Sequence, residues 1–242
     1  MSDDLRNVYE DHERASSYAQ LEFPGTYLLA FRDLPSIFTR HARGTRALDF
    51  GCGAGRSTRF LRDRGFEVTG IDISEAMLER ARGFDPAGDY RLVKEGDLSA
   101  VGSAEFDLIL SAFTFDNIVN EAVKLATLEQ LCARLAPEGR IVSVVSSPEI
   151  YLHEWASFTT RDFPENRRAK SGEKVLIVML DVPDRRPVED ILCTDDDYAR
   201  LYARAGLTVV EVMRPLADGS EGIAWKSETT TAPWVVYVLA SG

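Results

Sequence analysis

Short apolar runs alternate with amphipathic segments through the first 146 residues of the chain. The runs at 47–50, 66–72, 90–94, 106–111 and 140–146 are brief and rich in branched or aromatic side chains, which is typical of buried strands. Helical spacing predicts helices over 57–64, from Ser74 onward and over 120–135, with stop signals at Gly65, Pro137 and Gly139. Strands that alternate with helices at this interval predict βαβ units and a mostly parallel sheet covered on both faces.

The flanking parts of the chain follow other patterns. After a break at Pro24-Gly25, apolar residues recur with a helical period as far as Phe38, which predicts a helix that covers the core. Beyond residue 147, β-rich runs at 173–182 and 187–193 predict a small inserted antiparallel element. Thr194 is placed to cap a helix over 195–205, and runs at 207–214 and 234–239 predict two closing strands around a loop at 215–233.

Composition narrows the classes of protein that fit. The 28 Lys and Arg residues against 39 Asp and Glu give a formal net charge of −11, which disfavours a sequence-independent grip on DNA or RNA. Three cysteines lie far apart with no Cys-x-x-Cys pair, so we expect neither a metal centre nor a disulfide framework. The start is acidic and no run reaches about 18 apolar residues, so we expect a cytoplasmic protein that does not engage a membrane.

The segment with the clearest chemistry is Leu48-Asp49-Phe50-Gly51-Cys52-Gly53-Ala54-Gly55, at the turn between the first strand and the next helix. Glycines at alternate positions allow a sharp turn and let a ligand approach bare backbone N–H groups. The dinucleotide fingerprint Gly-x-Gly-x-x-Gly fails because Arg56 occupies its third glycine position, and Asp49 would repel a pyrophosphate. A cationic cofactor without phosphates would instead be attracted by that carboxylate.

Further acidic residues follow the next strands of the predicted sheet. Asp72 ends the second strand, Asp97 follows the third, and Asp116 follows the fourth. A carboxylate at Asp72 can accept both hydroxyls of a ribose, and one at Asp97 can accept an adenine amino proton. Because open α/β sheets bind ligands at the carboxyl ends of their strands, the joint pattern predicts a cofactor cleft at this edge.

These segments, with Gly70-Ile71-Asp72-Ile73-Ser74, Gly96-Asp97 and Phe106-Asp107-Leu108-Ile109, resemble the class I S-adenosylmethionine-dependent methyltransferases. The resemblance covers about residues 45–146 and is specific for the family, not for a substrate. It implies an α/β, Rossmann-like, doubly wound seven-stranded sheet with the last strand antiparallel. It also implies S-adenosylmethionine as cofactor and S-adenosylhomocysteine as product.

The resemblance implies, position by position, which residues contact the cofactor. Residues 49–55 would line its methionine portion, Asp72 would hold the ribose, and Asp97 would contact the adenine amino edge. The implied set is Asp49, Gly51, Cys52, Gly53, Gly55, Asp72, Ile73, Met77, Gly96, Asp97, Leu98, Ser111, Ala112 and Phe113. Cys52 is interpreted as a small packing residue. We add Tyr27, whose ring suits a sulfonium, and Arg32, which could meet the cofactor carboxylate.

The remaining segments are expected to form the acceptor side of a single domain spanning residues 1–242. Its parts would be an N-terminal helical lid (1–44), a cofactor-binding core (45–147), an inserted substrate-side segment (148–193) and the C-terminal part of the sheet (194–242). Aromatic walls suit a flat or apolar small molecule, such as an aromatic or heterocyclic acceptor. The expected substrate-binding residues are Tyr9, Tyr18, Asp116, Trp155 and Trp225.

The expected reaction is an in-line displacement that moves the sulfonium methyl group to an N or O atom of a small molecule, driven mainly by positioning. His153 follows the fifth strand and is the expected general base, which a hydroxyl acceptor usually needs. Other hypotheses remain open at this point. They are a methyltransferase acting on tRNA or protein, a dinucleotide-dependent oxidoreductase, and a non-catalytic cofactor sensor. The sequence does not determine the acceptor or the oligomeric state.

Overall fold

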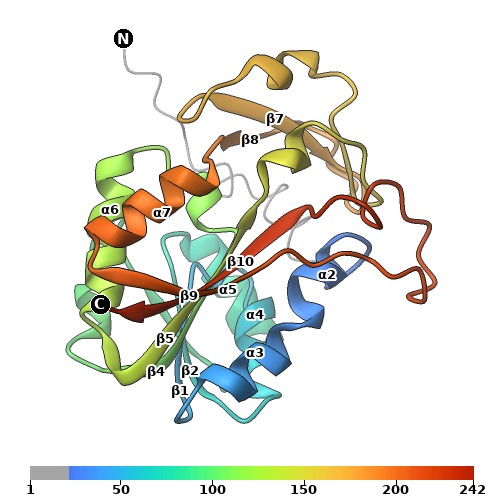
Figure 1. The fold of residues 1–242 in the computed structure, drawn as a ribbon. Helices are drawn as coiled ribbons and strands as arrows, with labels where there is room; N and C mark the ends of the chain where they lie inside the picture. The colour runs from blue at the N-terminus through green and yellow to red at the C-terminus, as the bar shows by residue number, and fades with distance from the viewer. Residues whose placement is uncertain (1–21) are drawn as a thin grey trace.

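A seven-stranded mixed sheet forms the centre of the computed structural model, which describes residues 22–242 (Figure 1). Its strands are β1 (Arg46–Phe50), β2 (Glu67–Asp72), β3 (Asp89–Leu92), β4 (Phe106–Ala112), β5 (Leu135–Ser146), β9 (Leu207–Met213) and β10 (Trp234–Ser241). They lie in the order β3-β2-β1-β4-β5-β10-β9. The first five pair in parallel, and β10 runs antiparallel to both β5 and β9. The predicted fold class, with its antiparallel last strand, is confirmed.

The chain reverses direction across the sheet between β1 and β4. It moves outward from β1 to β2 and β3, then crosses to the opposite side of β1 to form β4. Such a switch point leaves a crevice at the carboxyl ends of the two central strands, where open α/β sheets bind their ligands. The glycine turn after β1 and residues 113–116 after β4 both lie at this edge.

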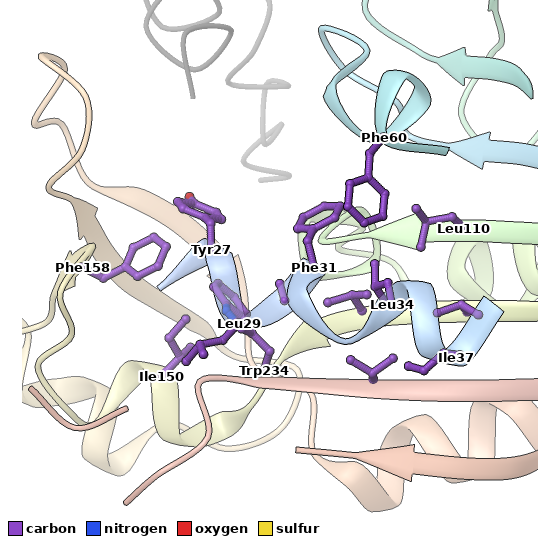
Figure 2. Packing of buried hydrophobic residues seen from close by; sticks show 14 of the residues in the cluster. Tyr27, Leu29, Phe31, Leu34, Ile37, Phe60, Leu110, Ile150, Phe158 and Trp234 are labelled. Atoms are coloured by element: carbon purple, nitrogen blue, oxygen red, sulfur yellow. The ribbon is translucent and has the colours of Figure 1, made fainter. Parts of the chain in front are cut away.

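Helices cover both faces of the sheet (Figure 1). Side chains of α2 (Tyr27–Arg32), α3 (Leu34–His41) and α4 (Arg56–Arg62) share one apolar cluster with alternate residues of the central strands (Figure 2). The other alternate residues pack with α6 (Glu121–Cys132) and α7 (Asp195–Arg204), and α5 (Glu75–Phe84) packs against β2 and β3. Successive strand residues point to opposite faces, so a sheet covered on both sides needs nearly continuous apolar strands.

A second, three-stranded antiparallel sheet is inserted between β5 and α7. It consists of β6 (Phe158–Thr159), β7 (Lys174–Met179) and β8 (Val188–Ile191) in the order β6-β7-β8. Short 3-10 helices connect the elements: η2 (Ser99–Val101), η3 (Phe115–Asn117), η4 (Pro148–Tyr151) and η5 (Pro164–Arg168). The inserted β element is confirmed, whereas β6 was not predicted because two residues carry no alternation pattern.

Two predicted boundaries differ from the structure. The expected continuous helix up to Phe38 breaks at Asp33, which ends α2 and precedes α3, and Pro35 lies in the first turn of α3. Strand β5 begins at Leu135 and not at Arg140, even though it contains Pro137 and Gly139. A register shift between Phe106 and Leu108 accommodates this early part of the strand. Proline and glycine are therefore tolerated where the ladder is already irregular.

Two predicted helix caps are confirmed by hydrogen bonds. The Ser74 side chain accepts from the Met77 N–H at the start of α5. Thr194 forms a reciprocal capping box with Asp197 at the start of α7. Each cap satisfies backbone donors that the first helical turn leaves unpaired, so both helices start where the sequence places them.

Candidate functional site

The glycine turn after β1 is tied back onto the neighbouring strand. The N–H groups of Gly51 and Cys52 both donate to the Ile71 carbonyl in β2, at 2.9 Å each. Gly51 has a φ of 73°, and a Cβ atom there would lie 2.1 Å from Thr114 Oγ1. Both the backbone conformation and this close approach exclude a side chain at Gly51. The turn therefore packs directly on the residues that follow β4.

Asp72, at the end of β2, is held by the same turn. Its Oδ2 accepts the Gly53 N–H at 2.8 Å, and its Oδ1 accepts the Ser74 N–H at 2.8 Å. Burial raises the pKa of this carboxyl, and the backbone N–H donors of Ser74, Gly53 and Ile73 oppose that rise. An ionised carboxylate offers about four acceptor sites, so it can still accept from a ligand. This geometry fits a group that presents paired hydroxyls, as a ribose does.

Asp49 provides a buried carboxylate beneath the turn. Its Oδ2 accepts hydrogen bonds from the hydroxyls of Ser57 and Thr58 on α4, at 2.7 and 2.6 Å. Its Oδ1 is buried and has no partner among the described residues. Burial is the largest cause that raises the pKa of Asp49 from 3.8 to about 6. An unpaired buried carboxylate oxygen fits a ligand with positive charge, as S-adenosylmethionine has, and does not suit a pyrophosphate.

The residues expected at the adenine form an edge of mixed character. Ile73 is 46% exposed and Met77 is buried. Asp97 is exposed, and the Ser99 N–H donates to its Oδ1 at 2.9 Å, which lowers the pKa of its carboxyl. Leu98 is buried and its N–H donates to Gln130 Oε1. An exposed apolar side chain after β2 and an exposed acceptor after β3 are groups that a purine can use.

The end of β4 brings a strained residue to the same edge. Phe113 has a φ of 64°, and no other non-glycine residue in the described part of the chain has a positive φ. Its ring lies 4.6 Å from that of Trp234 and 5.7 Å from that of Tyr27. Ser111, two residues earlier, is buried with an unpartnered Oγ, and Ala112 is partly buried. Such strain, held by surrounding packing, is typical of ligand sites.

Tyr27 and Arg32, both on α2, lie in different surroundings. Tyr27 is buried, and the Arg56 guanidinium lies 5.1 Å from the centre of its ring. Arg32 pairs with Asp33 and with Glu221, each at 2.9 Å. It lines a groove of about 720 Å³ along α4 that none of the acidic cleft residues reaches. Reaching a cofactor carboxylate would therefore require Arg32 to leave these two pairs.

The structure places two expected substrate-binding residues in closed packing. Trp155 is fully buried and donates its indole N–H to the Ile150 carbonyl at 2.8 Å. Asp116 is buried and accepts from the Ser146 N–H at 2.9 Å and from the Tyr198 hydroxyl at 3.2 Å. Buried polar groups need hydrogen-bond partners, and in this arrangement both residues have theirs within the protein and not in a substrate.

The other expected acceptor-side residues lie elsewhere. Trp225 is partly buried and donates to Glu221 Oε2 at 3.0 Å. His153 has a side chain that is 42% exposed, and its Nε2 lies 3.0 Å from Glu149 Oε2. Its described partners are Glu149 and the Trp155 ring, and the glycine turn is not among them. Tyr9 and Tyr18 lie outside the described residues.

Sequence reasoning missed the residues that support the site from behind. Ser57 and Thr58 orient Asp49, and Thr114 fills the space that a side chain at Gly51 would need. Thr114 also donates to the Phe50 carbonyl at 3.0 Å. Two hydroxyl residues in the first turn after a glycine loop were a usable signal for the first pair. Nothing local in the sequence indicated Thr114, because its partner lies 64 residues away.

Comparison with known proteins identifies the class to which this fold and site belong. A family model described as a methyltransferase domain matches residues 25–212, so the chain belongs to that family. Together with the seven-stranded sheet and the acidic glycine turn, the match makes the chain a class I S-adenosylmethionine-dependent methyltransferase, with S-adenosylmethionine as its cofactor. The dinucleotide-dependent oxidoreductase hypothesis is thereby set aside.

Individual relatives extend over most of the chain. It is 26% identical over 215 residues to N-demethylindolmycin N-methyltransferase from Streptomyces griseus, covering 86% of this chain and 90% of the relative. It is 31% identical over 194 residues to a ubiquinone biosynthesis O-methyltransferase from Alkalilimnicola ehrlichii, covering 67% and 76%. The solved CcbJ methyltransferase of Streptomyces caelestis superposes with a TM-score of 0.66 at 18% identity, covering 92% of this chain and all of that one. No described helix is long and apolar enough to cross a membrane.

Substitution of Asp72 by alanine tests the ribose assignment. We expect S-adenosylhomocysteine to bind roughly tenfold more weakly, since a hydrogen bond to a charged group contributes about 1.5 kcal/mol or more. Isothermal titration with the purified protein measures the change. Asp89→Ala is a control, because Asp89 lies at the amino end of β3, away from the glycine turn, and pairs with Arg91. Equal affinity for the Asp72 variant and the native protein would contradict the assignment.

Proposed function

We propose that this methyltransferase moves a methyl group from S-adenosylmethionine to an N or O atom of a small molecule. The observation that carries the proposal is the alignment with N-demethylindolmycin N-methyltransferase over 90% of that enzyme's length. A relative that extends through the acceptor-side segments supports similar use of those segments more strongly than a match to the glycine turn alone. Because another relative is an O-methyltransferase, the proposal includes oxygen as well as nitrogen acceptors.

A buried group of aromatic rings packs beside the end of β4, and we assign it to the acceptor-side wall of the cleft. Tyr27, Phe158 and Trp234 come from three separate segments, and their ring centres lie 5.1 to 5.8 Å apart. Phe113 joins them at the end of β4, 4.6 Å from Trp234. Rigid rings of this kind favour a flat or apolar acceptor, and electron-rich faces attract a positively charged sulfonium. The wall therefore supports an aromatic or heterocyclic acceptor.

Positioning is the main contribution that these residues make to the reaction. The cofactor, when bound, supplies a methyl group activated on a sulfonium. Asp72 would orient the ribose of the cofactor, and Asp49 would balance its positive charge. The wall would exclude water and align the acceptor for in-line displacement. A neutral nitrogen acceptor keeps a lone pair for attack, whereas a hydroxyl must lose a proton.

A screen of methyl acceptors tests the proposal directly. We expect purified protein with labelled S-adenosylmethionine to methylate at least one member of a panel of phenols, amines, amino sugars and nitrogen heterocycles. S-adenosylhomocysteine should raise the Tm, because it binds only the folded state. Total tRNA and a protein lysate serve as comparison acceptors. Label transferred only to tRNA or to protein would overturn the small-molecule proposal, as would absence of any transfer by a protein that binds the product cofactor.

A further inference from the structure

Three acceptor-side segments meet at one buried carboxylate, that of Glu228. The residue lies in the long loop between β9 and β10 and is 0% exposed. Its Oε1 accepts from the Thr26 hydroxyl at 2.6 Å and from the Ala156 N–H at 2.7 Å. Its Oε2 accepts from the Lys226 N–H at 2.9 Å. One side chain thus joins the segment before α2, the inserted segment and the late loop.

Thr26 is bonded through every polar group it has. Besides donating to Glu228, its Oγ1 accepts the Ser157 N–H at 3.0 Å. Its own N–H donates to Ser157 Oγ at 2.8 Å, and its carbonyl accepts from Trp234 Nε1 at 2.8 Å. The residue is completely buried. Because each unmade bond in such a network costs free energy, the whole set favours a single arrangement.

We call the hydrogen-bonded contact of Thr26, Ser157 and Glu228 the junction. The backbone just before Thr26 lies close against it. Gly25 has a φ of 48°, and a Cβ atom at that position would lie 2.2 Å from Ser157 Oγ. The backbone therefore approaches the inserted segment more closely than any side chain would allow. The same Ser157 hydroxyl donates to the Pro24 carbonyl at 3.4 Å. Pro24-Gly25, predicted only to interrupt a helix, also contacts the inserted segment.

The junction fixes the positions of two aromatic rings. Tyr27 directly follows Thr26, and Phe158 directly follows Ser157, so each ring is carried by a residue next to a bonded partner. The centres of the two rings lie 5.1 Å apart, with their planes tilted by 60°, beside Trp234 (Figure 2). Tyr27 also lies edge-on to Phe113, 5.7 Å away, where β4 ends beside the glycine turn. Moving Thr26 relative to Ser157 would therefore separate the rings.

We propose that Glu228 and Thr26 are positioning residues for methyl transfer, which hold the Tyr27–Phe158 pair as the acceptor-side wall of the cleft. The inference rests on the proposed function, because it assigns this wall to the acceptor. Neither residue contacts the glycine turn through any described hydrogen bond, so their effect on the cofactor is expected to be small. The acceptor should therefore be affected much more strongly than the cofactor.

Thr26→Val removes the hydroxyl while keeping the shape of the side chain, and Thr26→Ser keeps the hydroxyl and serves as the matched variant. For an acceptor found by the screen, we expect Thr26→Val to raise its KM at least tenfold. S-adenosylhomocysteine affinity should stay within twofold, and Thr26→Ser should restore KM. Glu228→Gln should shift KM in the same direction as Thr26→Val. A fall of cofactor affinity in parallel with KM, or an unchanged KM in a folded Thr26→Val protein, would overturn the inference.

Amide hydrogen exchange separates this inference from the proposed function if no acceptor is found. With S-adenosylhomocysteine bound, we expect the amides of Ala156 and Ser157 to exchange at least tenfold faster in Thr26→Val than in Thr26→Ser. The amides of Gly51 and Cys52 in the glycine turn should exchange at equal rates in both variants. Unchanged exchange at 156 and 157 would reject the junction itself, whereas failure of the acceptor screen alone would reject only the proposed substrate class.

Discussion

Replacement of Gly51 by alanine should weaken S-adenosylhomocysteine binding by at least roughly 100-fold, about 3 kcal/mol. The added Cβ would lie 2.1 Å from Thr114 Oγ1, 2.5 Å from Cγ2 and 2.8 Å from Cβ. Rotating the threonine cannot relieve the contact with its Cβ, so the turn or the end of β4 must move. A non-glycine residue at a φ of 73° costs roughly a further 1–2 kcal/mol.

Gly65→Ala provides the matched control for backbone strain. Gly65 has a φ of 87°, but a Cβ there meets nothing within 4 Å. Titration calorimetry and thermal unfolding of both variants separate the two effects. We expect Gly65→Ala to lose stability only, while Gly51→Ala loses stability and cofactor affinity. Equal cofactor affinity in the two variants would show that the close approach to Thr114 does not shape the site.

The sequence was sufficient for the features that depend on neighbours along the chain. The strands other than β6, the glycine turn after β1, and the caps at Ser74 and Thr194 follow from patterns a few residues long, apart from the early start of β5. The family resemblance supplied the seven-stranded sheet with its antiparallel last strand, which no local pattern contains. Once β1 and β4 are adjacent, residues after each strand must lie at one edge, because parallel strands end together.

Side-chain environments across long sequence separations were not predictable in this way. Trp155 follows β5 closely enough to suggest a place at the cleft, yet its indole is fully buried and donates to the Ile150 carbonyl. Asp116 has the position of a ligand-binding acid but is satisfied by Ser146 and by Tyr198, 82 residues away. A polar side chain faces a protein partner when the fold brings a donor from a distant part of the chain within hydrogen-bond distance. Spacing along the sequence does not show which donors will lie that close.

Cofactor affinity should decrease as the pH falls below about 6, because the Asp49 carboxyl then takes up a proton. A positively charged ligand favours the ionised carboxylate, so the pKa of Asp49 is lower in the complex than in the free protein. Affinity should accordingly be constant above about pH 6 and fall by up to tenfold per pH unit below it. Calorimetric titration with S-adenosylmethionine between pH 5 and pH 8 measures this slope, which Asp49→Asn should abolish. A flat profile in the native protein would contradict the charge-balancing role of Asp49.

The ionised Asp49 carboxylate should lower the free energy of unfolding of the ligand-free protein. Burial raises the pKa of Asp49 from 3.8 to about 6, so the folded state binds this proton more tightly than the unfolded state does. The resulting destabilisation is absent below about pH 4 and complete above about pH 6, where it amounts to at most about 3 kcal/mol.

Asparagine at position 49 removes the buried charge and the destabilisation that the charge causes. It also leaves an unpaired buried amide group, which lowers the stability of the variant by roughly 1–3 kcal/mol. We therefore expect Asp49→Asn to raise the Tm of the ligand-free protein at pH 7 by a few degrees and to bind S-adenosylmethionine at least tenfold more weakly. Thermal unfolding with and without the cofactor measures both effects. A variant that loses stability and affinity together would show that Asp49 mainly anchors Ser57 and Thr58. A higher Tm together with a weaker cofactor affinity would mean that the buried charge of Asp49 lowers stability and is retained because it binds the cofactor.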